Sequence, residues 1–165
     1  MRKTIVVYGS STGTCEEIAN RISSKLCADV INVTDLTADV IASNENLILG
    51  TSTWGAGELQ DDWYDGVNVL KSADLAGKTI ALFGCGDSES YPDTFCGGMK
   101  ELYDVVKTAN VIGAVSTEGY VFDDSEAVLN GKFVGLALDD VNESDKTEAR
   151  IDNSKSLDDY YKFND

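Results

Sequence analysis

Short runs of apolar, largely β-branched residues alternate along this chain with stretches whose apolar residues recur at helical spacing. The runs occupy residues 4–8, 29–33, 46–50, 78–84 and 111–115. Strands joined through helices by short connections form right-handed β-α-β units, and these build a parallel sheet with helices on both faces. The alternation therefore predicts an α/β fold.

The helical stretches between the runs are amphipathic. In residues 13–26, Cys15, Ile18 and Ile22 fall on one face, and Glu16 and Glu17 occupy the N-terminal turn, where acidic residues are favoured. The same spacing recurs through Trp63, Val67 and Leu70 and through Phe95, Met99, Leu102, Tyr103 and Val106. No repeat, low-complexity tract or linker interrupts this order, so residues 1–165 are predicted to form a single domain.

The segment after the fifth run breaks the alternation. Residues 117–133 are polar and rich in turn-forming residues, and residues 134–138 again have the pattern of a strand. An insertion that splits the last strand into two pieces explains this pattern.

The charge and the missing residue types restrict the chemistry. The chain has 13 basic and 29 acidic side chains, a net charge of −16, so its surface repels nucleic acid and anionic membranes and attracts basic proteins. It has no histidine, which removes the commonest general base and most zinc sites. Its four cysteines lack C-x-x-C spacing, and no apolar run could span a bilayer. We therefore expect a cytoplasmic protein with free thiols.

A loop of hydroxyl residues and glycines, GSSTGTC at residues 9–15, follows the first strand and opens a helix. Hydroxyl groups, a tight turn and the free amides of a helix N-terminus together form a cradle for phosphate. The loop lacks the lysine of a P-loop and the glycine spacing of a dinucleotide fingerprint. Neutral donors alone suit the terminal phosphate monoester of a bound cofactor.

Two aromatic residues follow neighbouring strands, where parallel α/β sheets bind their ligands. Trp54 follows the third run, and Tyr91 follows the fourth together with the acceptor Asp87. Either aromatic alone is more often part of a core. Two of them at adjacent strand ends, both beside a phosphate loop, indicate a ligand with a phosphate at one end and a planar ring at the other.

Four blocks carry a resemblance to a known family: YGSSTGT at residues 8–14, GTSTWGAGELQ at 50–60, ALFGCGD at 81–87 and NGKFVGLALD at 130–139. Through them the chain resembles the long-chain flavodoxins over residues 3–151. The resemblance implies a flavodoxin-like three-layer α/β/α sandwich with a five-stranded parallel sheet in the order 2-1-3-4-5. Its last strand is split by the insertion at about residues 117–133. The tail, residues 152–165, differs from the amphipathic helix with which relatives usually end.

The resemblance also implies non-covalently bound FMN. The first loop would hold its phosphate, Trp54 and Tyr91 would enclose its ring, and Asp87 would bond the polar edge of that ring. The peptide between Gly55 and Ala56 would turn over on reduction, which a glycine tolerates. The implied cofactor-binding residues are Ser10, Ser11, Thr12, Gly13, Thr14, Cys15, Thr53, Trp54, Gly55, Ala56, Gly57, Cys85, Gly86, Asp87 and Tyr91. Many relatives have threonine in place of Cys15. Cys15 lacks that hydroxyl group, so it would contact the phosphate through its backbone amide. No catalytic residue and no metal ligand is expected.

The function implied by the resemblance is that of a low-potential one-electron carrier, not an enzyme, which uses the semiquinone/hydroquinone couple of FMN. Stacking aromatics and the negative charge disfavour an anionic reduced ring and lower its potential. Glu58, Asp61, Asp62 and Glu89 are expected to form an acidic rim for the basic docking faces of redox partners of the flavodoxin/ferredoxin reductase type. A monomer that binds neither nucleic acid nor membrane is expected.

The main alternative is an FMN-dependent NAD(P)H quinone-type reductase on the same fold. Such an enzyme needs space for a second substrate above the ring, which Trp54 and Tyr91 would fill. A phospho-signalling receiver domain would need an aspartate at the end of the third strand, where Thr51 stands. A flavin-free interaction module would have no need of the intact phosphate loop.

Overall fold

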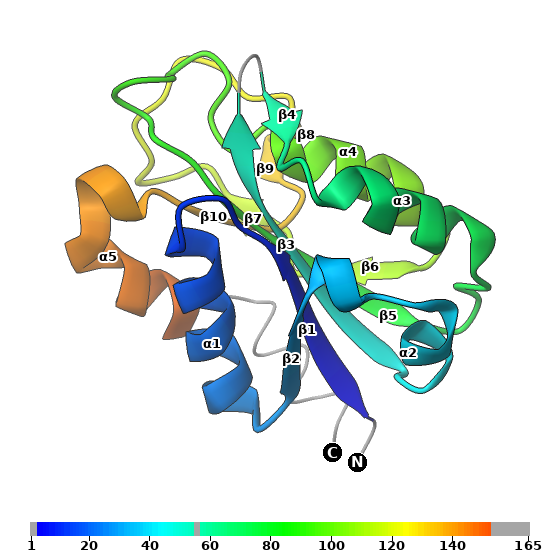
Figure 1. The fold of residues 1–165 in the computed structure, drawn as a ribbon. Coiled ribbons are helices and arrows are strands. Elements are labelled where there is room, and N and C mark those ends of the chain that lie inside the picture. The colour runs from blue at the N-terminus through cyan, green and yellow to red at the C-terminus, as the bar shows by residue number, and fades with distance from the viewer. Residues whose placement is uncertain (1–2, 55–56, 153–165) are drawn as a thin grey trace.

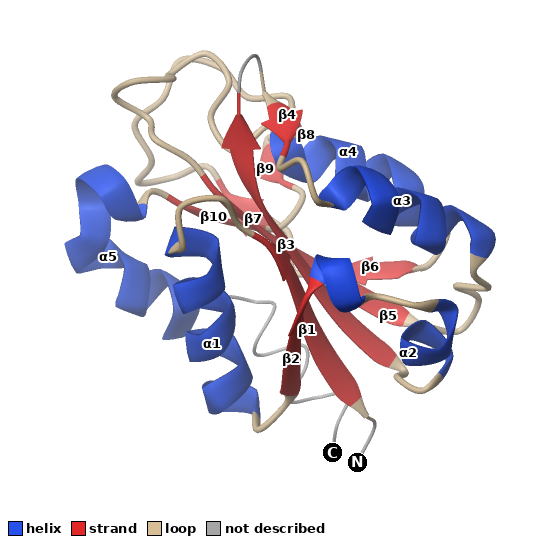
Figure 2. Ribbon diagram, in the orientation of Figure 1, coloured by secondary structure: helices blue, strands red, loops and turns tan. Residues whose placement is uncertain are grey.

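The computed structural model describes residues 3–54 and 57–152. A single layer of strands lies between two layers of helices (Figures 1 and 2). The helices are α1 Thr14–Leu26, α2 Ala38–Ala42, α3 Trp63–Ser72, α4 Gly98–Val106 and α5 Asp140–Asp152, with a short 3-10 helix at Val33–Asp35. The longer strands are β1 Thr4–Gly9, β2 Asp29–Asn32, β3 Asn46–Trp54 and β5 Thr79–Cys85. Short strands are β4 Glu58–Leu59, β6 Asn110–Ile112, β7 Val115–Ser116, β8 Val128–Leu129, β9 Lys132–Phe133 and β10 Leu136–Leu138.

The main sheet is parallel and has the order β2-β1-β3-β5, with β6 and β10 both pairing with β5. β6 lies against the start of β5, where Asn110 is opposite Thr79, and β10 lies against its end, where Leu138 is opposite Cys85. The two pieces together form the fifth strand. This confirms the predicted strand order and the split of the last strand.

β8 and β9 lie within the predicted insertion, and together with β7, which directly precedes it, they form a small antiparallel sheet in the order β7-β9-β8. Its first strand corrects one predicted boundary: the fifth run was placed at residues 111–115, but β6 ends at Ile112 and Val115 pairs with Phe133 of β9. Gly113, which has a φ of +87°, separates the two strands. The turn at this glycine directs the chain out of the main sheet.

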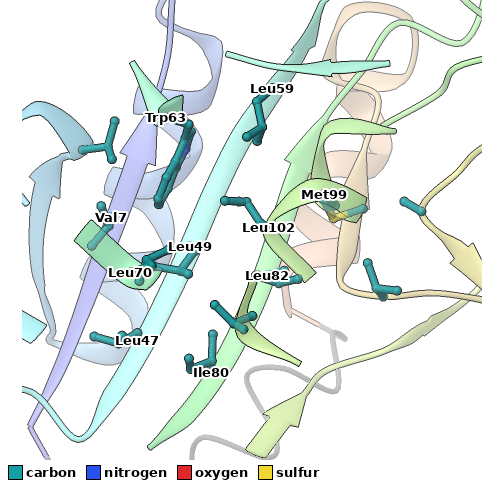
Figure 3. Packing of buried hydrophobic residues seen from close by; sticks show 14 of the residues in the cluster. Val7, Leu47, Leu49, Leu59, Trp63, Leu70, Ile80, Leu82, Met99 and Leu102 are labelled. Atoms are coloured by element: carbon teal, nitrogen blue, oxygen red, sulfur yellow. The ribbon is translucent and has the colours of Figure 1, made fainter. Parts of the chain in front are cut away.

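The core consists of two clusters, one on each face of the sheet. Val6 and Ile48 belong to the cluster beneath α1 and α5, whereas their neighbours Val7 and Leu49 belong to the cluster beneath α3 and α4 (Figure 3). This alternation follows from the period of two along a strand, and it leaves both faces of the central strands apolar. α1 and α5 cover one face in Figure 1, and α3 and α4 cover the other.

The last helix, α5, is mostly polar, and its buried residues are Thr147 and Ile151. It begins directly after β10, so its first turn lies near the carboxyl ends of the strands, and the helix then runs back beside α1 (Figure 1). The atypical tail predicted from the sequence falls, beyond Asp152, outside the described residues. None of the helices in the described ranges is long and apolar enough to cross a membrane.

Candidate functional site

Three loops meet at one edge of the sheet because β1, β3 and β5 run in the same direction. The first loop joins β1 to α1, the second follows β3, and the third joins β5 to α4. They border a pocket of about 240 Å³, lined by Thr12, Thr14, Ser52, Thr53, Trp54, Cys85, Gly86, Asp87, Tyr91, Thr94, Phe95, Cys96 and Val141.

The predicted site residues fall into three groups. Those that line this pocket are Thr12, Thr14, Thr53, Trp54, Cys85, Gly86, Asp87 and Tyr91. Ser10, Ser11, Gly13, Cys15 and Gly57 belong to the same loops or their flanks but do not line the pocket itself. Gly55 and Ala56 lie outside the described residues.

The first loop leads directly into α1. Gly13 has a φ of +94°, which strains any residue with a side chain, and its carbonyl accepts the first helical bond from the Glu17 N–H at 3.0 Å. The Gly13 N–H donates to Ser10 Oγ at 3.1 Å, while the side chains of Ser11 and Thr12 are exposed. The loop thus presents hydroxyl groups at the positive end of a 13-residue helix, an arrangement that favours an anion.

Cys15 points away from this surface and into the core. Its thiol is fully buried, and a hydrogen bond with Cys85, together with that burial, raises the pKa of Cys15 well above its ordinary value. The thiol therefore stays protonated and packs between α1 and β5. A ligand on the loop can contact Cys15 only through its backbone.

Trp54 and Tyr91 are large aromatic side chains that stay exposed, at 43% and 57%. Trp54 ends β3, where it pairs with Glu58 of β4, and its Nε1 donates to Ser52 Oγ at 2.8 Å. The backbone N–H of Tyr91 donates to the carbonyl of Asp87 at 2.8 Å, which holds the backbone of Tyr91 in the third loop. Exposed aromatic faces on a common pocket are typical of a site for a planar ligand.

Asp87 accepts two hydrogen bonds, from Asn142 Nδ2 at 2.8 Å and from the Ser90 N–H at 3.0 Å. These bonds lower the pKa of Asp87, so its carboxylate is ionised at neutral pH and serves as an acceptor at the pocket. Asn142 Nδ2 also donates to the buried Asp139 at 2.9 Å, and the Ser88 hydroxyl donates to the same carboxylate. This network holds the third loop against the start of α5.

Several residues that line the pocket were not predicted from the sequence: Ser52, Thr94, Phe95, Cys96 and Val141. Val141 comes from the start of α5, which was not predicted as a helix. The nearest predicted feature was the block at residues 130–139, which ends at Asp139. Phe95 was predicted on a helical face, but α4 begins at Gly98, and the Phe95 N–H donates to the carbonyl of Asp124 in the insertion at 3.3 Å. Thr94 and Cys96 belong to the same stretch, whereas Ser52 precedes Trp54 on β3.

Known proteins resemble this chain along nearly its whole length. A flavodoxin from Helicobacter pylori is 40% identical over 152 residues, which cover 92% of this chain and 93% of that protein. A flavodoxin from Nostoc is 41% identical over 155 residues, with 91% of each chain covered. The crystal structure of a Fusobacterium nucleatum flavodoxin bound to flavin mononucleotide superposes with a TM-score of 0.86 at 34% identity, covering 92% of this chain and 93% of that one.

The sequence pattern of one family, described as flavodoxin, matches residues 6–153. That range contains all three loops of the pocket, the insertion and both pieces of the split strand. The chain belongs to the flavodoxin family.

Proposed function

We propose that this chain binds one FMN non-covalently in the pocket and carries single electrons between redox proteins. The observation that carries the proposal is the placement of Trp54 and Tyr91, both exposed, on the same pocket as the hydroxyl loop before α1. A phosphate and a planar ring are the two parts that such a site can hold. The Fusobacterium relative is a flavodoxin bound to flavin mononucleotide, a ligand that has both of these parts.

Each part of the site suits a part of FMN. The hydroxyls of Ser11, Thr12 and Thr14 and the amides that open α1 would hold the phosphate without any basic side chain. Trp54 and Tyr91 would flank the ring, and Asp87 would accept hydrogen bonds from its polar edge. The remaining predicted contacts, Ser10, Gly13, Cys15, Thr53, Gly55, Ala56, Gly57, Cys85 and Gly86, would act largely through the backbone.

FMN supplies the one-electron chemistry, and the protein sets its electrostatic environment. The ionised Asp87 at the pocket and the net charge of −16 oppose any further negative charge there, which lowers the reduction potential. The chain has no histidine to serve as a proton donor. The relatives are flavodoxins, and nothing in them supports the alternative of a quinone-type reductase.

The partners we propose are redox proteins with basic docking faces, such as reductases of the flavodoxin/ferredoxin type. Glu58, Asp61 and Glu89 are exposed and Asp62 is half-buried. Glu58 is on β4, opposite Trp54, and the other three are on the loops that follow β4 and β5. An acidic rim of this kind steers a basic partner toward the exposed ring edge. We further propose that the chain is a single domain, works as a monomer and resides in the cytoplasm.

Titration of the flavin-free protein with FMN tests the binding step. We expect flavin fluorescence to be quenched at a stoichiometry of one FMN per chain, because Trp54 and Tyr91 would stack on the ring. Flavin fluorescence and protein thermal stability are measured in parallel, since a ligand of the folded state raises the melting temperature. Fluorescence unchanged by the protein, together with an unchanged melting temperature, would contradict the proposal.

A further inference from the structure

Gln60 connects the phosphate loop with the segment that follows Trp54. It lies between β4 and α3 and is 3% exposed. Its Nε2 donates to Ser11 Oγ at 3.1 Å across 49 residues of sequence. Its backbone N–H donates to Thr51 Oγ1 at 3.2 Å, which ties Gln60 to the end of β3. The side chain thus links the first and second loops of the site.

The orientation of the Gln60 amide follows from its second partner. The backbone N–H of Asp62 donates to Gln60 Oε1 at 3.0 Å, and a backbone N–H cannot accept. The oxygen therefore faces Asp62 N–H, and Nε2 must be the atom next to Ser11 Oγ. The other hydrogen of Nε2 goes to Asp62 Oδ2 at 3.0 Å, so both amide hydrogens are used.

This arrangement decides what the Ser11 hydroxyl can do. Because Ser11 Oγ accepts a hydrogen bond from Gln60, its own hydrogen is available for donation to another acceptor. Ser11 is exposed on the loop that opens α1, so that acceptor can be a ligand. A donor hydroxyl fixed in advance loses less entropy on binding than one that rotates freely.

The residues around Gln60 pack closely against its side chain. A Cβ on Gly9 would lie 2.5 Å from Gln60 Oε1 and 2.6 Å from Trp63 Cδ1, so a glycine at the end of β1 is needed for this approach. Trp63 is fully buried behind it. The amide is therefore held by packing as well as by its hydrogen bonds.

We propose that Gln60 is a positioning residue, which fixes the Ser11 hydroxyl as a hydrogen-bond donor to the phosphate of the cofactor. The inference rests on the proposed FMN function. It concerns the phosphate end of the ligand alone, because Gln60 does not line the pocket with the exposed aromatics. Gln60 variants should therefore discriminate between FMN and riboflavin, which has the same ring without the phosphate.

The test measures dissociation constants for FMN and riboflavin in the wild-type protein and in Gln60→Met, which keeps the length of the side chain without a donor. We expect FMN binding to weaken about fivefold, since a hydrogen bond contributes about 1 kcal/mol, and riboflavin binding to change less than about twofold. Gln60→Glu should weaken FMN binding further. Its carboxylate would accept from the Ser11 hydroxyl, turn that hydrogen away from the phosphate and add a negative charge.

Ser11→Ala keeps the measurement informative if a Gln60 variant fails to fold, because the Ser11 side chain is exposed. It should show the same selective loss of FMN affinity, and adding Gln60→Met in that background should cost nothing more. Equal losses for both ligands, or no loss in Ser11→Ala, would overturn the inference while leaving the FMN function intact. A wild-type protein that binds neither ligand would instead overturn the proposed function.

Discussion

Replacing Trp54 by alanine is expected to weaken FMN binding about thirtyfold. The indole is 43% exposed on the pocket, and loss of its stacking and of the apolar area it would bury on FMN corresponds to about 2 kcal/mol. Trp54→Phe should retain much of the affinity because it keeps an aromatic face. Fluorescence titration of the flavin-free variants with FMN gives the dissociation constants.

Tyr64→Ala is the matched control for Trp54. Tyr64 is an aromatic residue with a similar exposure, 48%, but it lies on α3 and does not line the pocket. Its removal should leave the dissociation constant of FMN unchanged. If Trp54→Ala and Tyr64→Ala bind FMN equally well, the ring does not stack on Trp54.

Replacing Trp63 by alanine is expected to destabilise the protein by about 3–5 kcal/mol, a large part of the stability of a domain of this size. Trp63 is fully buried at the start of α3 (Figure 3), and its Nε1 donates to the carbonyl of Gly50 at 2.8 Å. The variant creates a cavity under α3 and leaves the Gly50 carbonyl without that donor. Urea unfolding of the flavin-free variant measures the change in the free energy of unfolding.

Tyr64→Ala serves again as the control, because Tyr64 is the next residue of the same helix and faces solvent. It should change the free energy of unfolding by less than about 0.5 kcal/mol. A loss below about 1 kcal/mol in Trp63→Ala would show that α3 does not pack on the sheet as described.

The fold could be predicted from the sequence because the central strands are apolar on both faces. Continuous apolar runs such as β1 and β5 are typical of a parallel sheet that helices cover on both faces. Because the strands are parallel, the loops that follow them lie at one edge of the sheet. Thr12, Trp54 and Tyr91 therefore could be expected together, and the structure places all three on one pocket. The split last strand was also predictable, since a polar insertion interrupts an apolar pattern that then resumes.

The remaining features depend on contacts that leave no periodic signal. β3 extends to Trp54 because the two-residue strand β4 pairs with its end, and two residues show no recognisable alternation. Phe95 fits a helical spacing but lies before α4, where its N–H bonds the insertion. Asn142 reaches Asp87 across 55 residues of sequence from a helix with few buried side chains.

Stepwise anaerobic reduction of the FMN-loaded protein, followed by visible absorption, tests the central claim most directly. The ionised Asp87 at the pocket and the net charge of −16 oppose the addition of a second negative charge, so the two electrons should enter in two separate stages at distinct potentials. Two resolved one-electron stages are the expected result. Direct bleaching in a single two-electron stage would contradict the account of a one-electron carrier.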